Sequence, residues 1–332
     1  MERELYVKYI VMGIAKCPIK HTLIEKLWIK YRKEGYYQRL LEKASCKEEP
    51  ITVIGKHGLR VELPFDQAQI QELPKNYVET YIRKILERYG IEGCYLCREL
   101  SFLNGRFDME KRWLLQYLMF PEGIKMFMEK VGISNKDARF VVIDGGNKKV
   151  ETILQVLLEY ANYLTIVTSR MEYFKNAVDI IYEETGLMID MVSLDTQKNI
   201  YGNVVINLDK DCNRLYSNFE ENAYVVDLHF TDQKLEYLAN RRNDLTILYD
   251  YDISVGGQCY NQELLVEIMV RDNWKASRFV KRDECSLTAS EIEFMVKDYD
   301  MQIERLKIIR KQHSFLKDID RSEEHTSELQ SR

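Results

Sequence analysis

Short hydrophobic runs alternate with amphipathic helical patterns through the second half of the chain. Six of these runs have the nearly continuous apolar character of strands that are buried on both faces. They cover residues 139–144, 164–168, 188–192, 203–207, 224–228 and 246–249. Apolar residues at helical spacing separate the first three runs, starting near Val150 and near Phe174. This order predicts an α/β fold with a doubly wound, mostly parallel sheet, whose ligands bind beyond the carboxyl ends of the strands.

The chain before this region is less regular and predicts a mixed α/β domain. Two β-type runs flank Lys56-His57-Gly58 and predict a β-hairpin. Pro74 precedes a helical pattern over 77–89, which Gly90 ends. We therefore expect a mixed N-terminal domain over 1–135, followed by the doubly wound domain over 136–272.

A capping box, Thr288-Ala-Ser-Glu291, opens the last helical pattern of the chain. Apolar residues three and four positions apart predict a long C-terminal helix that extends to about Lys311. We expect the segment 273–320 to pack back on the N-terminal domain. The alternative for the same residues is the seam of a coiled-coil homodimer. Residues 321–332 resemble a translated sequencing adapter, and we set them aside as an artefactual tail.

Composition narrows the classes of partner. The chain has 332 residues, of which 45% are hydrophobic and 30% charged, with a net charge of −5 and both signs interspersed. This balance gives no electrostatic basis for binding nucleic acid or an anionic membrane surface. No apolar run approaches the length of about 20 residues that spans a bilayer, and the charged N-terminus lacks a signal-peptide core. Seven cysteines, an odd number, favour a reducing compartment, so we expect a cytoplasmic protein.

A glycine turn, Asp144-Gly145-Gly146-Asn147, follows the first strand of the predicted sheet. Glycines at this place let the backbone approach a pyrophosphate, and the N-terminus of the next helix presents free N–H groups to it. The turn matches only part of a G-x-G-x-x-G pattern, so the prediction depends on its position between a strand and a helix. The two lysines that follow could add charge toward phosphate, whereas Asp144 repels phosphate unless it is paired or points away.

The end of the second strand predicts which dinucleotide binds. An acidic residue there bonds the ribose 2′-hydroxyl of NAD, whereas arginine accommodates the 2′-phosphate of NADP. The chain has Ser169 and Arg170 at this point and no acid before Glu172, which favours NADP over NAD. The alternative is an exposed arginine that starts a helix. The missing acid also disfavours an S-adenosylmethionine-dependent methyltransferase, which is the third functional class that we consider.

Several of these segments resemble one family. Over about 139–269 the chain resembles the NADP-binding domain of the shikimate dehydrogenase and glutamyl-tRNA reductase group. Ser169-Arg170-Met171 resembles the Asn-Arg-Thr type motif of that group, and the run that ends in Asn207-Leu208 resembles its Val-Ile-Asn-Ala-Thr strand. The resemblance implies a Rossmann-like domain with an NADP site. The site residues that we expect beside the cofactor are Gly145, Gly146, Asn147, Ser169, Arg170 and Asn207.

The chain also departs from that family. Ile143 stands in place of the first glycine of the turn, and Leu208-Asp209-Lys210 replace the small residues after Asn207. Neither the catalytic lysine motif of the dehydrogenases nor the Ser-Thr-Cys nucleophile of the reductases is found in residues 1–130. The resemblance therefore implies a cofactor domain without implying a reaction.

Two other groups could carry chemistry. His229 follows a predicted strand at the expected crevice, where a histidine can act as acid or base near neutral pH, or can simply be a polar neighbour of Asp227. Cys94 and Cys97 form a lone C-x-x-C with no second pair, which favours two ordinary buried cysteines over a metal or redox site.

The patterns together predict an NADP-binding protein, an oxidoreductase if it is an enzyme, with its site in the cleft between the domains. The alternative is a catalytically inactive Rossmann descendant that acts as a nucleotide-responsive or interaction protein. A small-molecule nucleotide is the expected partner in both cases.

Overall fold

The computed structural model describes residues 9–15, 46–103, 113–194, 199–210 and 216–310, which form two compact units. The first unit includes Met1–Leu118, Ile253–Cys285 and Glu293–Gln302, and the second includes Met119–Asp252, Ser286–Ile292 and Ile303–Arg332. These units differ from the predicted domains, since the second unit starts before residue 136 and the first takes up stretches after residue 252. The set-aside tail, 321–332, lies outside the described residues.

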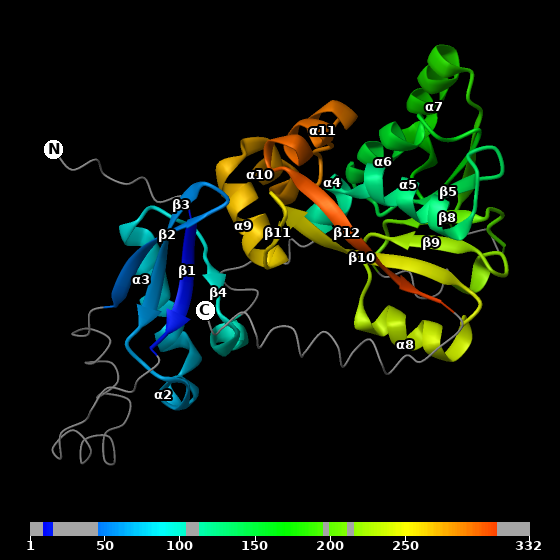
Figure 1. The fold of residues 1–332 in the computed structure, drawn as a ribbon. Helices are drawn as coiled ribbons and strands as arrows, with labels where there is room; N and C mark the ends of the chain where they lie inside the picture. The colour runs from blue at the N-terminus through cyan, green and yellow to red at the C-terminus, as the bar shows by residue number, and fades with distance from the viewer. Residues whose placement is uncertain (1–8, 16–45, 104–112, 195–198, 211–215, 311–332) are drawn as a thin grey trace, which may run out of the picture. The chain divides into compact units, whose positions relative to one another are not determined.

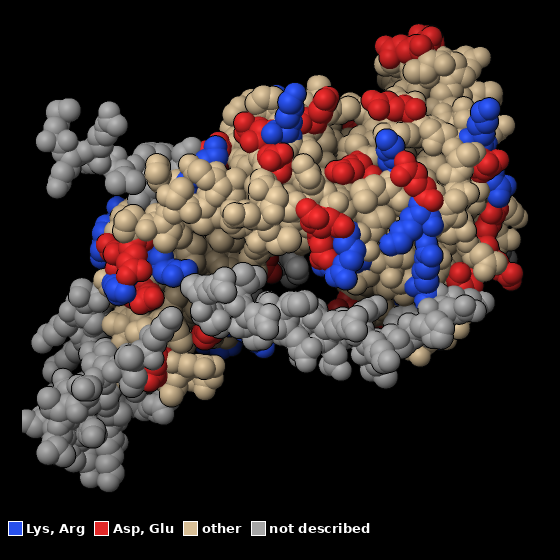
Figure 2. All heavy atoms as spheres, viewed as in Figure 1, with Lys and Arg blue, Asp and Glu red and all other residues tan. Residues whose placement is uncertain are grey.

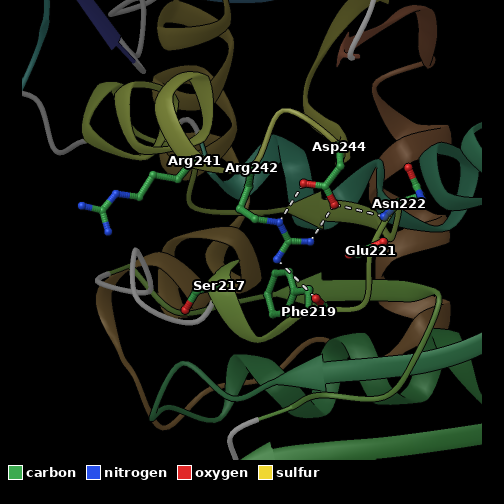
Figure 3. A pocket seen from close by; sticks show the side chains of 7 residues that line it. All are labelled: Ser217, Phe219, Glu221, Asn222, Arg241, Arg242 and Asp244. Carbon is green, nitrogen blue, oxygen red and sulfur yellow. Dashed lines mark hydrogen bonds and ion pairs between the residues drawn. The ribbon is translucent and has the colours of Figure 1, made fainter.

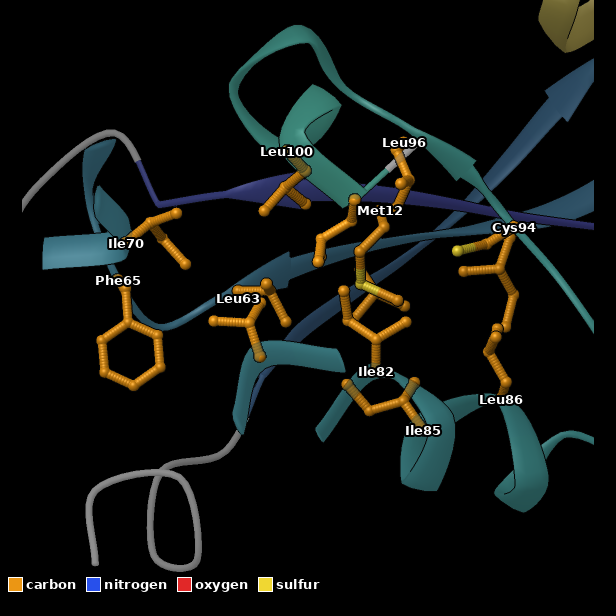
Figure 4. Packing of buried hydrophobic residues seen from close by; sticks show 14 of the residues in the cluster. Met12, Leu63, Phe65, Ile70, Ile82, Ile85, Leu86, Cys94, Leu96 and Leu100 are labelled. Carbon is orange, nitrogen blue, oxygen red and sulfur yellow. The ribbon is translucent and has the colours of Figure 1, made fainter. Parts of the chain in front are cut away.

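The first unit contains a four-stranded sheet in the order β2-β3-β1-β4. Its strands are β1 (Tyr9–Ile14), β2 (Lys47–Val53), β3 (Lys56–Leu63) and β4 (Tyr95–Leu96). Its helices are α2 (Gln67–Glu72), α3 (Lys75–Arg88), the 3₁₀ helix η1 (Arg98–Leu103), α4 (Trp113–Leu118), α9 (Gln262–Asp272) and α10 (Trp274–Lys281). β2 and β3 are antiparallel neighbours, which confirms the predicted hairpin. Figure 4 shows the core of this sheet, where Met12 and Leu63 lie beside Ile82 and Ile85 of α3.

The larger sheet has eight strands in the order β11-β10-β9-β8-β5-β6-β7, with β12 paired to β10. Its strands are β5 (Arg139–Ile143), β6 (Tyr163–Thr168), β7 (Ile189–Ser193), β8 (Val204–Asn207), β9 (Tyr224–Asp227), β10 (Thr246–Val255), β11 (Gln258–Cys259) and β12 (Met301–Ile309). All six predicted strands are present, and the strands from β7 to β10 are parallel to their neighbours. The strand order reverses between β5 and β8, so this is a Rossmann-like doubly wound sheet with its switch point there.

Helices cover both faces of the parallel strands, as Figure 1 shows, with α8 on one side and α5, α6 and α7 on the other. They are α5 (Phe120–Val131), α6 (Lys149–Leu157), α7 (Met171–Thr185) and α8 (Asp232–Arg241). This double cover explains why the strands are apolar at consecutive positions: all of Phe140–Ile143 is buried. The mixed α/β architecture that the sequence predicts is confirmed.

The predicted long C-terminal helix is wrong beyond Asp298. The capping box is formed, since Thr288 and Glu291 exchange hydrogen bonds of 3.0 and 3.2 Å, but α11 (Ala289–Asp298) has only ten residues. Asp300 follows with a φ of 48°, a left-handed conformation that an α-helix does not contain. The chain continues as strand β12, so the helical seam of a coiled-coil homodimer is also wrong there.

Figure 2 shows basic and acidic side chains interspersed on the visible face. In the portion that the structure describes, no helix is both long and apolar enough to cross a membrane.

Candidate functional site

A buried ion pair occupies the glycine turn at the carboxyl end of β5. The Asp144 carboxylate accepts hydrogen bonds from Arg170 on both oxygens, at 2.9 Å from Nε and 2.7 Å from Nη2. It also accepts from the Thr168 hydroxyl at 2.7 Å and from the Gly146 backbone N–H at 2.9 Å. A two-point bond between guanidinium and carboxylate is strong and oriented. Asp144 is therefore paired, and its charge is compensated inside the turn.

The Arg170 guanidinium also lies across the turn. Its Nη2 donates to the Asn147 carbonyl at 3.1 Å, and its Cζ lies 4.5 Å from the ring centroid of Tyr173. Tyr173 in turn donates a hydrogen bond to Glu151 of α6. Ser169, beside Arg170, has an exposed side chain. The side-chain hydrogen bonds that Arg170 makes to described residues come from Nε and Nη2, and 28% of its side chain is exposed.

The two glycines of the turn meet different physical needs. A Cβ on Gly145 would overlap the backbone carbonyl of Leu208, so the turn contacts the loop after β8 directly. Gly146 has a φ of 79°, a left-handed conformation that glycine adopts without strain, and has open space around it. Asn147 closes the turn, because its side-chain oxygen accepts from the Lys149 N–H at 3.0 Å. The fold itself therefore accounts for both glycines, whether or not a pyrophosphate lies over them.

The ends of β8 and β9 hold a buried polar network that the sequence interpretation missed. The side chains of Lys234 and Asp227 are fully buried, with Lys234 Nζ 3.1 and 3.2 Å from the two carboxylate oxygens. Asn207 donates to the same carboxylate at 2.9 Å, and the Tyr216 hydroxyl donates a further hydrogen bond. The predicted site residue Asn207 is thus part of the interior of the protein.

Lys234 also ties two loops together at this edge. Its Nζ donates to the backbone carbonyls of Asp209, after β8, and of His229, after β9, at 2.7 and 2.9 Å. A lysine in the first turn of a helix normally indicates a solvated side chain, so its spacing gave no hint of this role. One feature of the sequence could have indicated this buried pair, namely Asp227 at the end of an apolar strand. A carboxylate that is buried there needs a cation or several hydrogen-bond donors.

His229 lies at the predicted edge, but its protonation differs from the expectation. Burial lowers its pKa to about 4; the nearby Asp227 opposes this, and Lys210, Lys234 and Lys149 lower the pKa further. The imidazole is therefore neutral near pH 7 and carries no proton that it could donate as an imidazolium. The same electrostatics show that three lysines lie around this edge of the sheet.

A cavity of about 590 Å³ lies at the opposite, amino-terminal edge of β9 and β10 (Figure 3). Its lining residues are Ser217, Phe219, Glu221, Asn222, Arg241, Arg242 and Asp244. All five N–H groups of Arg242 are used: two donate to Asp244 at 2.8 Å, and the others donate to the carbonyls of Tyr216, Phe219 and Glu220. This arginine organises the loop before β9 and has no donor left for a ligand.

The C-x-x-C pair lies in and against the hydrophobic core of the four-stranded sheet. Cys94 is buried, and burial together with a hydrogen bond to Glu99 raises the pKa of the Cys97 thiol to about 12. Such a thiol is protonated and unreactive at neutral pH. Among the residues described, no group of three or more His, Cys, Asp or Glu side chains is arranged to hold a metal ion.

No protein-family profile and no curated protein matches this chain. It is similar to solved structures at low identity. A chorismate mutase/shikimate 5-dehydrogenase fusion protein from Clostridium acetobutylicum is 14% identical, with 87% of this chain and 95% of that chain covered and a TM-score of 0.30. L-tryptophan dehydrogenase from Nostoc punctiforme is 10% identical, with 88% and 79% covered and a TM-score of 0.35. Shikimate 5-dehydrogenase from Listeria monocytogenes is 11% identical, with 87% and 96% covered and a TM-score of 0.31. The Rossmann-like assignment itself rests on the strand order and connectivity of the eight-stranded sheet.

Proposed function

We propose that this chain binds a phosphate-bearing nucleotide over the Gly145–Gly146 turn, with NADP(H) as the favoured dinucleotide. The observation that supports this most directly is the ion pair between Asp144 and Arg170. A free carboxylate in the turn would repel phosphate, and the pairing removes that obstacle. The N-terminus of α6 then faces the carboxyl edge of the sheet, where helix dipoles and free N–H groups favour anions.

The proposed preference for NADP rests on the part of Arg170 that stays accessible. The exposed part of this side chain is left for a 2′-phosphate, while stacking on Tyr173 holds the guanidinium plane in place. No acid at the end of β6 would bond the 2′-hydroxyl of NAD, because Thr168, Ser169 and Arg170 occupy that position. Ser169 and Asn147 belong to the proposed site, whereas Asn207 supports it from inside.

A second candidate is the catalytically inactive version of the same fold. The missing catalytic lysine and Ser-Thr-Cys motifs in residues 1–130, together with Ile143 at the first glycine position of the turn, favour it. A catalytic role for His229 stays a prediction, and the proposed nucleotide site does not depend on it.

Thermal unfolding with NADPH, NADH or S-adenosylmethionine tests the nucleotide site. A ligand at 100 times its Kd that binds only the folded state adds about 2.7 kcal/mol of stability. We expect NADPH to raise the Tm more than NADH does. In a Lys148→Glu/Lys210→Glu variant, which alters two exposed lysines at the carboxyl edge, we expect the NADPH shift to disappear.

The matched control is Lys136→Glu, an exposed lysine before β5 at the opposite edge, which should keep the shift. A direct Arg170→Ala change is a poorer probe, because it leaves the buried Asp144 carboxylate without its cation. No shift with either dinucleotide would overturn the proposal and leave the interaction protein as the remaining candidate. A shift with S-adenosylmethionine alone would point to the methyltransferase class instead.

A further inference from the structure

The guanidinium of Arg170 is fixed along one edge and on one face. Its Nε and Nη2 bond the Asp144 carboxylate and the Asn147 carbonyl, at 2.7 to 3.1 Å. The ring of Tyr173 lies against one face, with its centroid 4.5 Å from Cζ. Even so, 28% of the Arg170 side chain is exposed, against 1% for Asp144. The guanidinium is therefore held in one orientation while part of the side chain faces solvent.

Tyr173 lies in the first turn of α7 and is 36% exposed, yet three contacts fix its ring. Arg170 lies over one face, and the buried Phe174 meets the ring edge-on, with centroids 5.0 Å apart and planes at 88°. The Tyr173 hydroxyl donates a hydrogen bond to the Glu151 carboxylate. Burial and this hydrogen bond raise the pKa of the Tyr173 hydroxyl, so it remains a donor throughout the neutral range.

Glu151 connects this ring to another segment of the second unit. It lies in the first turn of α6, and both of its carboxylate oxygens are bonded. Oε1 accepts from Tyr173, and Oε2 accepts from the Ser286 hydroxyl at 3.0 Å. The next residue, Thr152, is fully buried and accepts from the backbone N–H of Leu287 at 2.8 Å. Glu151 is therefore an anchored acceptor that reaches Arg170 through the tyrosine ring.

An arginine that is already oriented can distinguish two dinucleotides that differ by one phosphate. NADPH carries a phosphate at the adenosine 2′ position and NADH does not, so the interaction of that phosphate decides between them. A planar guanidinium bonds phosphate best through two parallel N–H groups, which requires one definite orientation of its plane. A side chain that is ordered beforehand also loses little further freedom on binding. The selectivity then depends on the groups that hold the plane.

We propose that Tyr173 and Glu151 determine the preference of the nucleotide site for a 2′-phosphate. The ring of Tyr173 supports the Arg170 guanidinium, and Glu151 is a positioning residue that acts through Tyr173. The Ser286 hydroxyl supports Glu151 in turn. This inference rests on the proposed function, because it needs a dinucleotide over the Gly145–Gly146 turn.

Isothermal titration calorimetry of the full chain with NADPH and with NADH tests the role of Tyr173. We expect NADPH to bind at least about tenfold more tightly than NADH, the size of one hydrogen bond to a charged group. Tyr173→Leu removes the supporting ring, so it should weaken NADPH binding about three- to tenfold and change NADH binding by less than about twofold. The matched control is Tyr182→Leu, a more exposed tyrosine of the same helix, which should leave both Kd values unchanged.

A second set of variants tests whether Glu151 acts through Tyr173. Glu151→Ala removes the acceptor, so it should lower the ratio of the two Kd values toward that of Tyr173→Leu. Glu151→Gln removes the charge but keeps an oxygen that accepts from the Tyr173 hydroxyl, so it should retain the original ratio. In Glu151→Ala/Tyr173→Leu the two effects should not add, because residues that act as one unit are not independent. A merely structural role of Glu151 would weaken both dinucleotides equally and leave the ratio unchanged.

The two dinucleotides separate failure of this inference from failure of the proposed function. A chain that binds neither NADPH nor NADH would overturn the proposed nucleotide site and this inference with it. A chain that binds both equally, or whose preference Tyr173→Leu leaves unchanged, would overturn the inference alone. A Glu151→Ala protein with the original ratio, or a Glu151→Gln protein that loses the ratio as fully as Glu151→Ala, would overturn it equally.

Discussion

Replacing Lys234 with methionine should destabilise the second unit severely. The ammonium group and the Asp227 carboxylate that it contacts are both fully buried. Methionine keeps most of the side-chain volume but removes the cation, so Asp227 keeps its charge without compensation. Removing one partner of a buried pair costs about 3–5 kcal/mol. The carbonyls of Asp209 and His229 lose their donor at the same time, which places the expected loss at the upper end of that range.

The expected loss is a large share of the stability of an ordinary domain, about 5–15 kcal/mol. Urea unfolding followed by circular dichroism should show the midpoint falling by more than about 1 M, given m-values of about 1–3 kcal/mol/M. Hydrogen exchange of the β8 and β9 amides would assign the loss to the strands that Lys234 joins. The control is Lys175→Met, a solvated lysine of α7 with one long ion pair, for which we expect at most about 0.5 kcal/mol.

A double variant separates the lost cation from lost packing. Lys234→Met/Asp227→Asn removes both charges, so it should be more stable than Lys234→Met alone, because no uncompensated carboxylate remains. A Lys234→Met protein within about 1 kcal/mol of the original would refute the reasoning, since that is the range of a solvent-exposed pair. A double variant that loses the full sum of both single changes would refute it as well.

Three further predictions concern the two edges of the large sheet. His229→Gln should flatten the pH dependence of the free energy of unfolding between pH 6.5 and 4. The pKa of His229 is about 4 in the folded chain and 6.5 in the unfolded chain, so the original protein has its full stability above pH 6.5 and loses up to about 3 kcal/mol toward pH 4. Urea midpoints across that range measure this, and parallel curves for the two proteins would contradict it. Asp244→Asn should lower the free energy of unfolding by about 2 kcal/mol at pH 7 and by almost nothing near pH 2. The hydrogen bond from Arg242 lowers the pKa of Asp244 to about 2, so the stability that the carboxylate contributes is lost as the pH falls from 3.8 toward 2. An equal loss at both pH values would count against the pair. Gly145→Ala should lower the free energy of unfolding by more than about 2 kcal/mol, because its Cβ would overlap the Leu208 carbonyl. Gly146→Ala should lower it by about 1 kcal/mol, because Gly146 is left-handed but has open space around it. A reversed order in thermal unfolding would show that the turn does not contact the loop after β8.

The strands of the large sheet could be predicted because a strand that is buried on both faces has apolar residues at consecutive positions. Every residue from Phe140 to Ile143 is buried, and this run is apolar without interruption. A glycine also follows α7: Gly186 adopts the left-handed conformation, with a φ of 73°, that glycine favours after a helix. Both patterns involve only residues that are close together in the sequence, so they can be recognised without knowing the tertiary structure.

The C-terminal strand shows where local patterns mislead. Leu306 and Ile309 continue a spacing of three and four residues from α11, and a helix was the natural interpretation. The segment instead pairs with β10, about fifty residues earlier, and Met301 and Ile303 alternate inward as strand residues do. Pairing with a distant strand decided the conformation, because it satisfies backbone groups that a helix would have satisfied locally.

The sequence by itself determined the strands of a mostly parallel sheet and the glycine turn where we propose that a nucleotide binds, because periodicity and glycine placement follow from local geometry. The strand order, and with it the switch point between β5 and β8, came only from the structure. Only the tertiary structure decided the charge state of that edge. Arg170 reaches Asp144 from 26 residues away, and Lys234 reaches Asp227 from a helix that looks solvated in sequence. Whether a charged residue faces water or a buried partner depends on how distant elements pack, and no local pattern records that choice.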